Sequence, residues 1–499
     1  MNNPSRMLRI GIIVATALTV WILLFLVLPT NLSFSNDQNV YLGGAAALRA
    51  GHGYRFEQYI DLPRIGMYPP GYSIWLALFW KNGQPISANS YRLEVANWIA
   101  AGGALFGLAA CLFIGELPAG ACAAFLMLFG TSLTFTQFTA WLMPDVLFVA
   151  GSCGLALLIA AYNPDRKLSL WWFAAGLLAG ALCVVKVAAI AYMAGLGVYG
   201  LLKGDLRRLS RLAYFALPAC SLTAWLLLRK GVPTYATLVR ISAFGGWTPF
   251  LVNTIEVAGR YCSGRWLVTD FLSVPDRLSS ARAFLGFSFL VEVAAFMLGL
   301  ALFVVPILLG IRKSWKQSQE QIILCVVGAY SLALFLWPYY DGARFGIALI
   351  PFLVNLIWRG LPSRLARAAF ITILVINIPA NAWLSHKFLR SQEKESPADL
   401  AALQQAVSWI NRTAGTGARV AAGRDVPLSH LYEYLGRRLL ANPGPHSASN
   451  YIDALPAAQE NQWADYWITD SSFYASIGSE KLYQFQRRFG RWTIVSPRR

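Results

Sequence analysis

Long apolar runs alternate with short polar loops along most of the chain, and this pattern predicts about eleven membrane-spanning helices. A run of about 20 apolar residues is long enough to cross the ~30 Å hydrocarbon layer as a helix. The first run, 10–29, follows a basic flank and lacks an Ala-x-Ala-type cleavage site, so it is predicted to be a retained span. The other spans are expected at 93–114, 119–135, 144–162, two short crossings within 170–202, 212–228, 284–311, 322–337, 345–358 and 366–384.

The basic residues of the short loops predict the orientation of the chain. Lys and Arg cluster at 166–167, 203–211, 312–316 and 359–367, which the positive-inside rule places in the cytoplasm together with the N-terminus. Because the run 170–202 lies between two such clusters, it is predicted to cross twice, with Lys186 at the outer apex. The long loops 30–92 and 229–282 are then expected outside the cell. The expected location is the inner (cytoplasmic) membrane of a bacterium.

The composition changes to that of a soluble domain near residue 386. Apolar residues recur at helical spacing over 400–410, while 418–422 and 466–469 are predicted strands and 428–435 a second helix. The chain is therefore divided into a membrane domain, 1–385, and a small C-terminal α/β domain, 386–499. The odd number of spans places this domain outside, in the periplasm, where it is expected to act as a recognition or structural cap.

Composition supports a polytopic α-helical membrane protein. The 499 residues are 57% hydrophobic and 13% charged, with a mean hydropathy of +0.49, outside the usual range of soluble domains. A net charge of +18 would indicate a nucleic-acid partner in a soluble chain, but here the basic residues lie largely in short loops and mark topology, so no nucleic acid is expected. The seven cysteines follow no paired or metal-ligand spacing, so neither a disulfide framework nor a zinc site is predicted.

Ionisable residues at membrane depth cost about 2.5–3.5 kcal/mol each and tend to be functional. By the predicted topology, five of them lie at the outer ends of spans: Asp37, Asp145, Lys186, Asp341 and Arg344. Taken singly, each has a plainer interpretation. Asp37 is equally a base or a helix cap, and Asp145, directly after Pro144, fits a cap better. Lys186 either binds phosphate or snorkels to the interface, and Asp341 and Arg344 form a local ion pair or take part in catalysis.

The first loop carries a motif with a family resemblance. The layout Asp37 to Tyr41, then 51–54 (Gly-His-Gly-Tyr), then 68–73 (Tyr-Pro-Pro-Gly-Tyr-Ser), resembles the first external loop of the GT-C superfamily of membrane glycosyltransferases. It is most similar to the branch containing protein O-mannosyltransferases and bacterial aminoarabinose transferases. The resemblance continues, in order, through 143–148, Lys186 and 344–351.

Two departures from the family pattern are visible. Asn36 and Gln38 flank Asp37, where family members often carry a second acidic residue, and Met67 and Tyr68 stand where aminoarabinose transferases have an acidic-basic pair. Both argue against an aminoarabinose donor. They also argue against a family-type metal site, so no cofactor is assigned, and a divalent metal is left open without support from the sequence.

The resemblance implies transfer of a sugar from a polyprenyl-phosphate donor to a glycolipid, polysaccharide or protein acceptor on the outer face of the membrane, with inversion. Asp37 is then the expected catalytic base. The expected substrate-orienting residues are Asp145, Tyr41, Tyr68 and Asp341, and the expected phosphate-binding residues are Lys186, Arg260, Arg265 and Arg344. A secondary transporter is the first alternative, although no internal repeat is visible. A polysaccharide ligase using a lipid-diphosphate glycan is the second.

Overall fold

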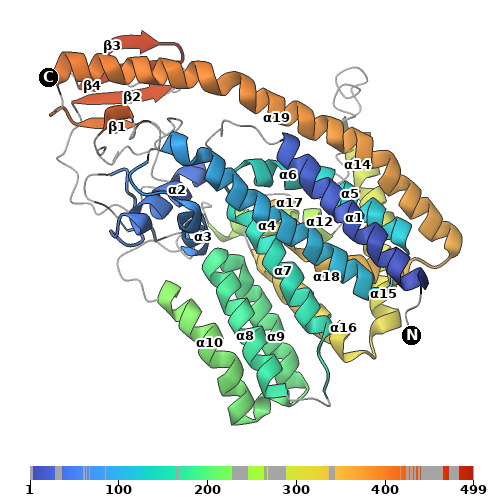
Figure 1. Cartoon of the computed structure of the whole chain (residues 1–499). Coiled ribbons are helices and arrows are strands. Elements are labelled where there is room, and N and C mark those ends of the chain that lie inside the picture. The colour runs from blue at the N-terminus through green and yellow to red at the C-terminus, as the bar shows by residue number, and fades with distance from the viewer. Residues whose placement is uncertain are drawn as a thin grey trace.

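The protein is helical over most of its length, with a small sheet near its C-terminus (Figure 1). The computed structural model describes residues 4–27, 36–59, 62, 64–66, 68–84, 86–164, 168–227, 246–262, 267, 288–336, 343–415, 417–422, 426, 431, 434–436, 439, 465–470 and 483–497.

The helices of the N-terminal half coincide with the predicted runs and add two helices inside the first loop. Their bounds are α1 (Pro4–Val27), α2 (Asn36–Arg49), α3 (Gly71–Phe79), α4 (Ile86–Ile114), α5 (Ala119–Thr131), α6 (Leu133–Ala140), α7 (Pro144–Ala160), α8 (Leu168–Val185), α9 (Ile190–Leu202) and α10 (Leu209–Leu227). The loop that follows α1 is thus held by α2 and α3 rather than being irregular throughout.

The second half has the same character up to its last helix. Its helices are α12 (Trp247–Cys262), α14 (Ser288–Gly299), α15 (Val305–Ser314), α16 (Ser318–Leu336), α17 (Ala343–Gly346), α18 (Ile350–Gly360) and α19 (Arg364–Ala414). A π-helical turn, 300–304, joins α14 to α15, and a 3-10 turn, 347–349, joins α17 to α18.

Helix length supports a multi-pass membrane protein but does not establish eleven spans. Within the described residues, five helices are long and apolar enough to cross a membrane, and a sixth crossing exists if α5 and α6 form one span. The other apolar helices, α7, α8 and α9, are shorter. The predicted span 119–135 is not straight either: α5 and α6 meet at 51°, and Ser132 caps the second helix by accepting a hydrogen bond from the Phe135 amide.

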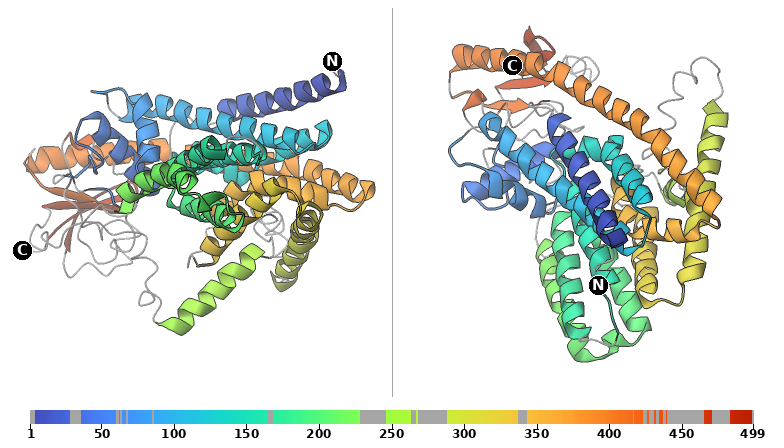
Figure 2. Two further views of the ribbon diagram at one scale, coloured as in Figure 1. Left: turned by 90° about the horizontal axis from the view of Figure 1, so that it is seen from below. Right: turned by 45° about the vertical axis from the view of Figure 1, so that its right-hand side comes forward.

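The run 170–202 forms two helices, as its length and flanking charges predict. α8 ends at Val185, Lys186 has extended backbone angles (φ −149°, ψ 124°), and the short turn 187–189 leads into α9. The two helices lie side by side with α10 at one end of the molecule (Figures 1 and 2). Lys186 therefore stands at the tip of a helical hairpin.

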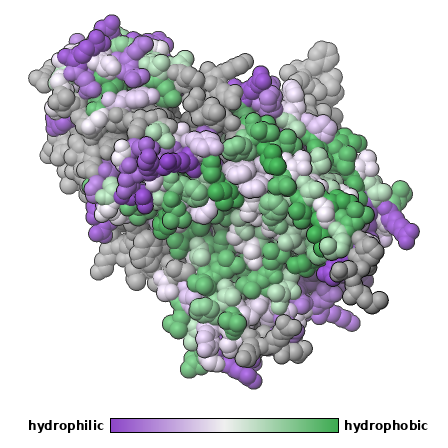
Figure 3. Space-filling model, viewed as in Figure 1, coloured by the Kyte–Doolittle hydropathy of each residue, from purple (hydrophilic) through white to green (hydrophobic). Residues whose placement is uncertain are grey.

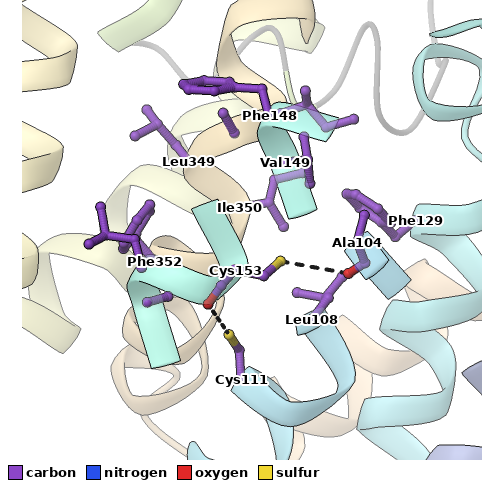
Figure 4. Packing of buried hydrophobic residues seen from close by; sticks show 14 of the residues in the cluster. Ala104, Leu108, Cys111, Phe129, Phe148, Val149, Cys153, Leu349, Ile350 and Phe352 are labelled. Carbon is purple, nitrogen blue, oxygen red and sulfur yellow. Dashed lines mark hydrogen bonds between the residues drawn. The ribbon is translucent and has the colours of Figure 1, made fainter. Parts of the chain in front are cut away.

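The membrane core is built where α4, α7 and α18 pack together (Figure 4). The Cys153 thiol donates to the Ala104 carbonyl at 3.6 Å, and the Cys111 thiol donates to the Cys153 carbonyl at 3.8 Å, so both thiols are buried and reduced. A Cβ atom at Gly107 would lie 2.6 Å from the Cβ of Cys153. Close approach of α4 and α7 therefore depends on the missing side chain at Gly107.

The long helix α19 leads from the helical body to the C-terminal sheet (Figure 2). The strands are β1 (Val420–Ala422), β2 (Tyr466–Asp470), β3 (Tyr483–Phe489) and β4 (Trp492–Pro497), in the order β1-β2-β4-β3 with only the β1–β2 pair parallel. Leu403, Val407 and Ile410 of α19 share an apolar core with Ile468 and Ile494 of the sheet.

Both predicted strands of the C-terminal region are confirmed within about two residues of their bounds. The expected domain boundary near residue 385 lies inside α19, which runs through it without a break. Most of the predicted helix 428–435 lies outside the described residues.

Surface hydropathy separates the two parts. Figure 3 shows apolar side chains gathered over the helical body and hydrophilic ones over the end that carries the sheet and over part of the first loop. Large apolar residues on the body are strongly exposed, among them Leu26 (70%), Leu217 (69%) and Leu365 (80%). Apolar surface of this extent is expected to contact lipid rather than water.

Candidate active site

Five side chains that are distant in sequence form one continuous polar cluster: Asp37, Tyr68, Asp145, Lys186 and Arg344. The Tyr68 hydroxyl donates to Asp37 Oδ1 at 3.1 Å, and Arg344 Nη2 donates to Asp37 Oδ2 at 3.0 Å. Arg344 Nε lies 3.5 Å from Asp145 Oδ2, and Lys186 Nζ donates to Asp145 Oδ1 at 2.5 Å. The four charged groups therefore alternate in sign, in the order Asp37, Arg344, Asp145 and Lys186, and the guanidinium bridges the two carboxylates.

Each charged member of the cluster comes from the start or the break of a helix. Asp37 and Asp145 lie in the first turns of α2 and α7. Lys186 occupies the extended break after α8, and Arg344 lies in the short helix α17. The first turn of a helix has unpaired N–H groups and a positive dipole end, which favours a carboxylate there.

The interpretation of Asp145 as a helix cap is wrong. Met143 occupies the N-cap position of α7 in extended conformation, and Pro144 starts the helix. The Asp145 side chain instead makes contacts with the two cations, and only 1% of it is exposed. Interfacial snorkelling does not describe Lys186 either. Its ammonium group faces inward, 4.5 Å from the centre of the Phe345 ring and 3.5 Å from the Arg344 carbonyl.

A glycine allows the first loop to reach the hairpin tip. A Cβ atom at Gly71 would lie 2.6 Å from the Val184 carbonyl oxygen and 2.9 Å from the Val185 amide nitrogen. Both of these backbone atoms immediately precede Lys186. The turn 68–72 can therefore pack on the end of α8 only because residue 71 has no side chain, and this packing brings the first loop to the part of the chain that carries Lys186.

Aromatic rings pack around Tyr68, the residue whose hydroxyl contacts Asp37. Tyr41 is 2% exposed and makes edge-to-face contacts with Tyr68 and Tyr72, at centroid distances of 5.5 and 5.2 Å. The Tyr72 hydroxyl donates to Asn97 Oδ1 at 3.1 Å. Packing of this kind restricts the Tyr68 ring and so fixes the hydroxyl that faces Asp37.

Asn97 was not predicted as a site residue, yet it binds the end of α6, directly before the helix that carries Asp145. Its buried side-chain amide donates to the backbone carbonyls of Phe138, Thr139 and Trp141, at 3.0, 2.6 and 3.1 Å. These carbonyls belong to the end of α6, directly before the turn into α7. The sequence did offer a signal for Asn97: it is a polar residue inside the predicted span 93–114, and polar groups at membrane depth require partners.

The remaining predicted residues are not joined to the cluster by a described contact. Arg260 forms an ion pair with Glu256, one turn earlier on α12. Arg265 and Asp341 lie outside the described residues. The described cluster thus contains two of the four predicted phosphate-binding cations.

Burial divides the cluster into a closed end and an open end. The side chains of Asp145 and Lys186 are 1% and 10% exposed, whereas those of Asp37 and Arg344 are 19% and 22% exposed. A reactant arriving from solvent or lipid therefore meets Asp37 and Arg344 first. The guanidinium also lies 5.8 Å from the centre of the Phe138 ring, which supports its planar face.

The donor set of the cluster suits an anion better than a divalent cation. Both carboxylates already lie within ion-pair distance of Arg344, and Asp145 also binds Lys186. A metal ion placed between them would face two positive groups at close range, which is repulsive. Across the described residues, no group of three His, Cys, Asp or Glu side chains could hold a metal ion.

Comparisons with known proteins identify the fold. No family model matches the chain, and no curated protein sequence matches it. ArnT from Cupriavidus metallidurans superposes with a TM-score of 0.55 at 12% identity when bound to undecaprenyl phosphate, and with 0.55 at 13% in its apo state, over 97% of both chains. The archaeal oligosaccharyltransferase AglB from Archaeoglobus fulgidus, in complex with an inhibitory peptide and a dolichol-phosphate, superposes with 0.54 at 13% identity, over 93% of this chain and 69% of AglB.

The chain has a GT-C-like membrane fold, because ArnT and AglB are both GT-C glycosyltransferases and the match extends over nearly its whole length. The fold expected from the first-loop motif is confirmed. Identities of 12–13% establish shared architecture and leave the roles of individual residues to the geometry of the cluster.

Proposed function

We propose that the protein is an inverting glycosyltransferase that moves a sugar from a polyprenyl-phosphate donor to a lipid, glycan or protein acceptor on the outer face of the membrane. The observation that carries the proposal is the open end of the cluster, where the carboxylate of Asp37 and the guanidinium of Arg344 are 3.0 Å apart. An acceptor of protons and a binder of phosphate are thus adjacent. The solved structures that share the fold support a lipid-linked donor, since one holds undecaprenyl phosphate and another dolichol-phosphate.

The reaction requires one proton acceptor and one anion binder. The acceptor hydroxyl attacks the anomeric carbon, its proton passes to Asp37, and the new oxygen–carbon bond forms as the bond from that carbon to the phosphate oxygen breaks. The electron pair leaves with the lipid phosphate. A base positioned in this way contributes about 10²- to 10⁴-fold to the rate. Attack from the face opposite the phosphate inverts the anomeric configuration.

Arg344 is suited to hold the departing phosphate. A guanidinium carries five N–H donors in one plane, so it can bind two phosphate oxygens and still retain a contact to a carboxylate. Stabilising negative charge where it develops is commonly the largest single catalytic contribution. Asp145 contacts Arg344 from the buried end of the cluster, so the substrate would approach from the more exposed end.

Asp145 and Lys186 have a supporting role in this proposal. Their ion pair is nearly closed to solvent, and Lys186 also donates to the Arg344 carbonyl, so the pair fixes the arginine through both its side chain and its backbone. Direct phosphate binding by Lys186, Arg260 or Arg265 stays a prediction. So does substrate orientation by Tyr41, Tyr68 and Asp341. The topology with a cytoplasmic N-terminus and a periplasmic C-terminal domain, in a bacterial inner membrane, belongs to the same proposal.

The test is transfer from a panel of labelled polyprenyl-phosphate sugars, measured in membranes that contain the protein. We expect label to move to an acceptor with the unaltered chain and not with Asp37→Asn. Asp399→Asn is the matched control, because Asp399 pairs with Arg491 near the sheet and lies outside the cluster. Transfer from a diphosphate-linked glycan alone would identify a ligase, and solute movement in proteoliposomes without sugar transfer would identify a transporter.

A further inference from the structure

Among the described residues, a contact between the C-terminal region and the first loop leads directly to the helix carrying Asp37. The amide N–H of Leu439 donates to the backbone carbonyl of Gln58 at 2.7 Å, and Leu439 forms a β-bridge with Tyr59. The side chain of Gln58 then donates from Nε2 to the Asn39 carbonyl at 2.9 Å. Asn39 lies in α2, two residues after Asp37. A single residue therefore bonds to the C-terminal region through its backbone and to the catalytic helix through its side chain.

The Gln58 side chain fits a slot in α2 that only glycine leaves open. A Cβ atom at Gly43 would lie 2.1 Å from Gln58 Oε1 and 2.4 Å from Nε2. Gln58 itself is 2% exposed, and Asn39 is 4% exposed. A buried, hydrogen-bonded amide in a fitted slot transmits displacement better than a solvated contact, because moving it leaves polar groups without partners.

Tyr59 joins the two apolar cores on either side of this contact. It packs against the core of the C-terminal region, which contains Leu439, and also against the small first-loop core, which contains Val40 and Phe56. Burial raises the pKa of Tyr59 to about 12, so the phenol is neutral at physiological pH. The contact between the C-terminal region and the loop is therefore both hydrogen-bonded and apolar.

We propose that Gln58 is a positioning residue that couples the C-terminal region to the helix carrying Asp37. The role as a positioner of a catalytic base rests on the proposed function, whereas the mechanical coupling does not. When the C-terminal region shifts, as on binding an acceptor, the backbone of Gln58 shifts with it and its side-chain amide moves α2. The C-terminal region then regulates the base without contributing a group to the reaction.

Hydrogen exchange of the full-length protein in detergent tests the coupling without any substrate. Gln58→Ala removes the side-chain contact, and we expect amide exchange in 36–49 to rise about tenfold, as for loss of one buried hydrogen bond. Leu439→Pro removes the N–H donor on the other side, and Leu439→Ala, which keeps the donor, is its control. We expect the proline variant to raise exchange in α2 well beyond the alanine variant. Unchanged protection of α2 in both Gln58→Ala and Leu439→Pro would overturn the proposal.

Gly43→Ala provides a second approach that does not alter Gln58. In an ordinary helix this change is stabilising, because alanine has the higher helix propensity. Here the new methyl group displaces the Gln58 amide, so we expect the usual increase in α2 protection to be lost. In the Gln58→Ala background the slot is empty, and there Gly43→Ala should slow exchange in α2. Equal effects of Gly43→Ala in both backgrounds would contradict the fitted slot.

Binding and turnover separate this inference from the proposed function. We expect Gln58→Ala to bind undecaprenyl phosphate as the unaltered protein does, measured as a shift in thermal unfolding, while the rate of sugar transfer falls about tenfold at saturating donor. A purely structural role would lower the unfolding temperature and leave the transfer rate of the folded fraction unchanged, which would contradict positioning. If the unaltered chain transfers no sugar, the proposed function fails, and the exchange data alone decide the coupling.

Discussion

The two ends of the polar cluster contain the same kinds of groups, an aspartate and a cation, and differ in burial. Asp145 and Lys186 form the closed end, 1% and 10% exposed, while Asp37 and Arg344 form the open end, 19% and 22% exposed. A buried ion pair is held because either partner alone would be an unpaired charge in a poorly solvated site. A partly exposed pair can exchange its partner for a substrate. Under the proposed function, the same residue types thus give an anchor at one end and a reactive pair at the other.

The largest effect is expected from removing the proposed proton acceptor at the open end. Asp37→Asn keeps the size of the side chain and its ability to accept from the Tyr68 hydroxyl. We expect turnover to fall by about 10²- to 10⁴-fold, because the amide cannot take the acceptor's proton. Undecaprenyl phosphate should still bind, since Arg344 stays in place. Turnover within twofold of the unaltered chain would exclude Asp37 as the base.

Substitutions at the closed end should lower the stability of the fold rather than alter the chemical step directly. Lys186→Met leaves Asp145 with one cation fewer, and we expect a loss of about 3–5 kcal/mol of stability, seen as a lower unfolding temperature and a lower folded yield. Adding Asp145→Asn removes the stranded charge, so the double variant should recover most of that loss. A phosphate-binding Lys186 would behave differently, since the double variant would then fold but lose its affinity for undecaprenyl phosphate.

The charged residues of the cluster were predictable from the sequence, but their pairing was not. Asp37, Asp145, Lys186 and Arg344 were each identified, because ionisable residues next to apolar runs are conspicuous. Their pairing was not predictable from spacing, since 307 residues separate Asp37 from Arg344 and 41 separate Asp145 from Lys186. Periodicity within helices gives no information about contacts of this range. The family resemblance placed the residues in one site, and the packed helices supply the partners.

The helices, like the site residues, were predictable from local sequence, whereas their contacts were not. Apolar runs located α7 and the end of α4 closely, although α4 begins at Ile86 rather than at 93, and charge clusters on both sides of 170–202 predicted the hairpin that carries Lys186. The bend between α5 and α6 was missed, because an apolar run stays apolar across a kink made by a local cap at Ser132. The close approach at Gly71 was missed for another reason. A glycine in a Pro-Pro-Gly turn indicates a turn, and nothing in the sequence shows that the end of α8 packs against it.

A substitution of the bridging cation distinguishes charge from geometry at the open end. Arg344→Lys keeps the positive charge, but one ammonium group cannot reproduce the planar contacts that join both carboxylates to a phosphate. We expect affinity for undecaprenyl phosphate to fall about 10- to 100-fold, measured by titration of thermal unfolding. Retained affinity in this variant would mean that only the charge matters. Arg491→Lys is the control, because Arg491 pairs with Asp399 near the sheet and lies outside the cluster.

The smallest expected effect is at Tyr68, whose hydroxyl is the only part of the residue that touches Asp37 in a described contact. Tyr68→Phe keeps the ring packed edge-on to Tyr41 and removes one hydrogen bond of 3.1 Å. A hydrogen bond to a charged group contributes about 1.5–3 kcal/mol at most, and solvent replaces part of it at this partly exposed site, so we expect a two- to tenfold loss of turnover. Tyr41→Phe is the comparison variant, because it removes a hydroxyl from the neighbouring ring and keeps both the ring packing and the Tyr68 hydroxyl. An equal loss in both variants would show that the effect is not specific to the hydroxyl that contacts Asp37.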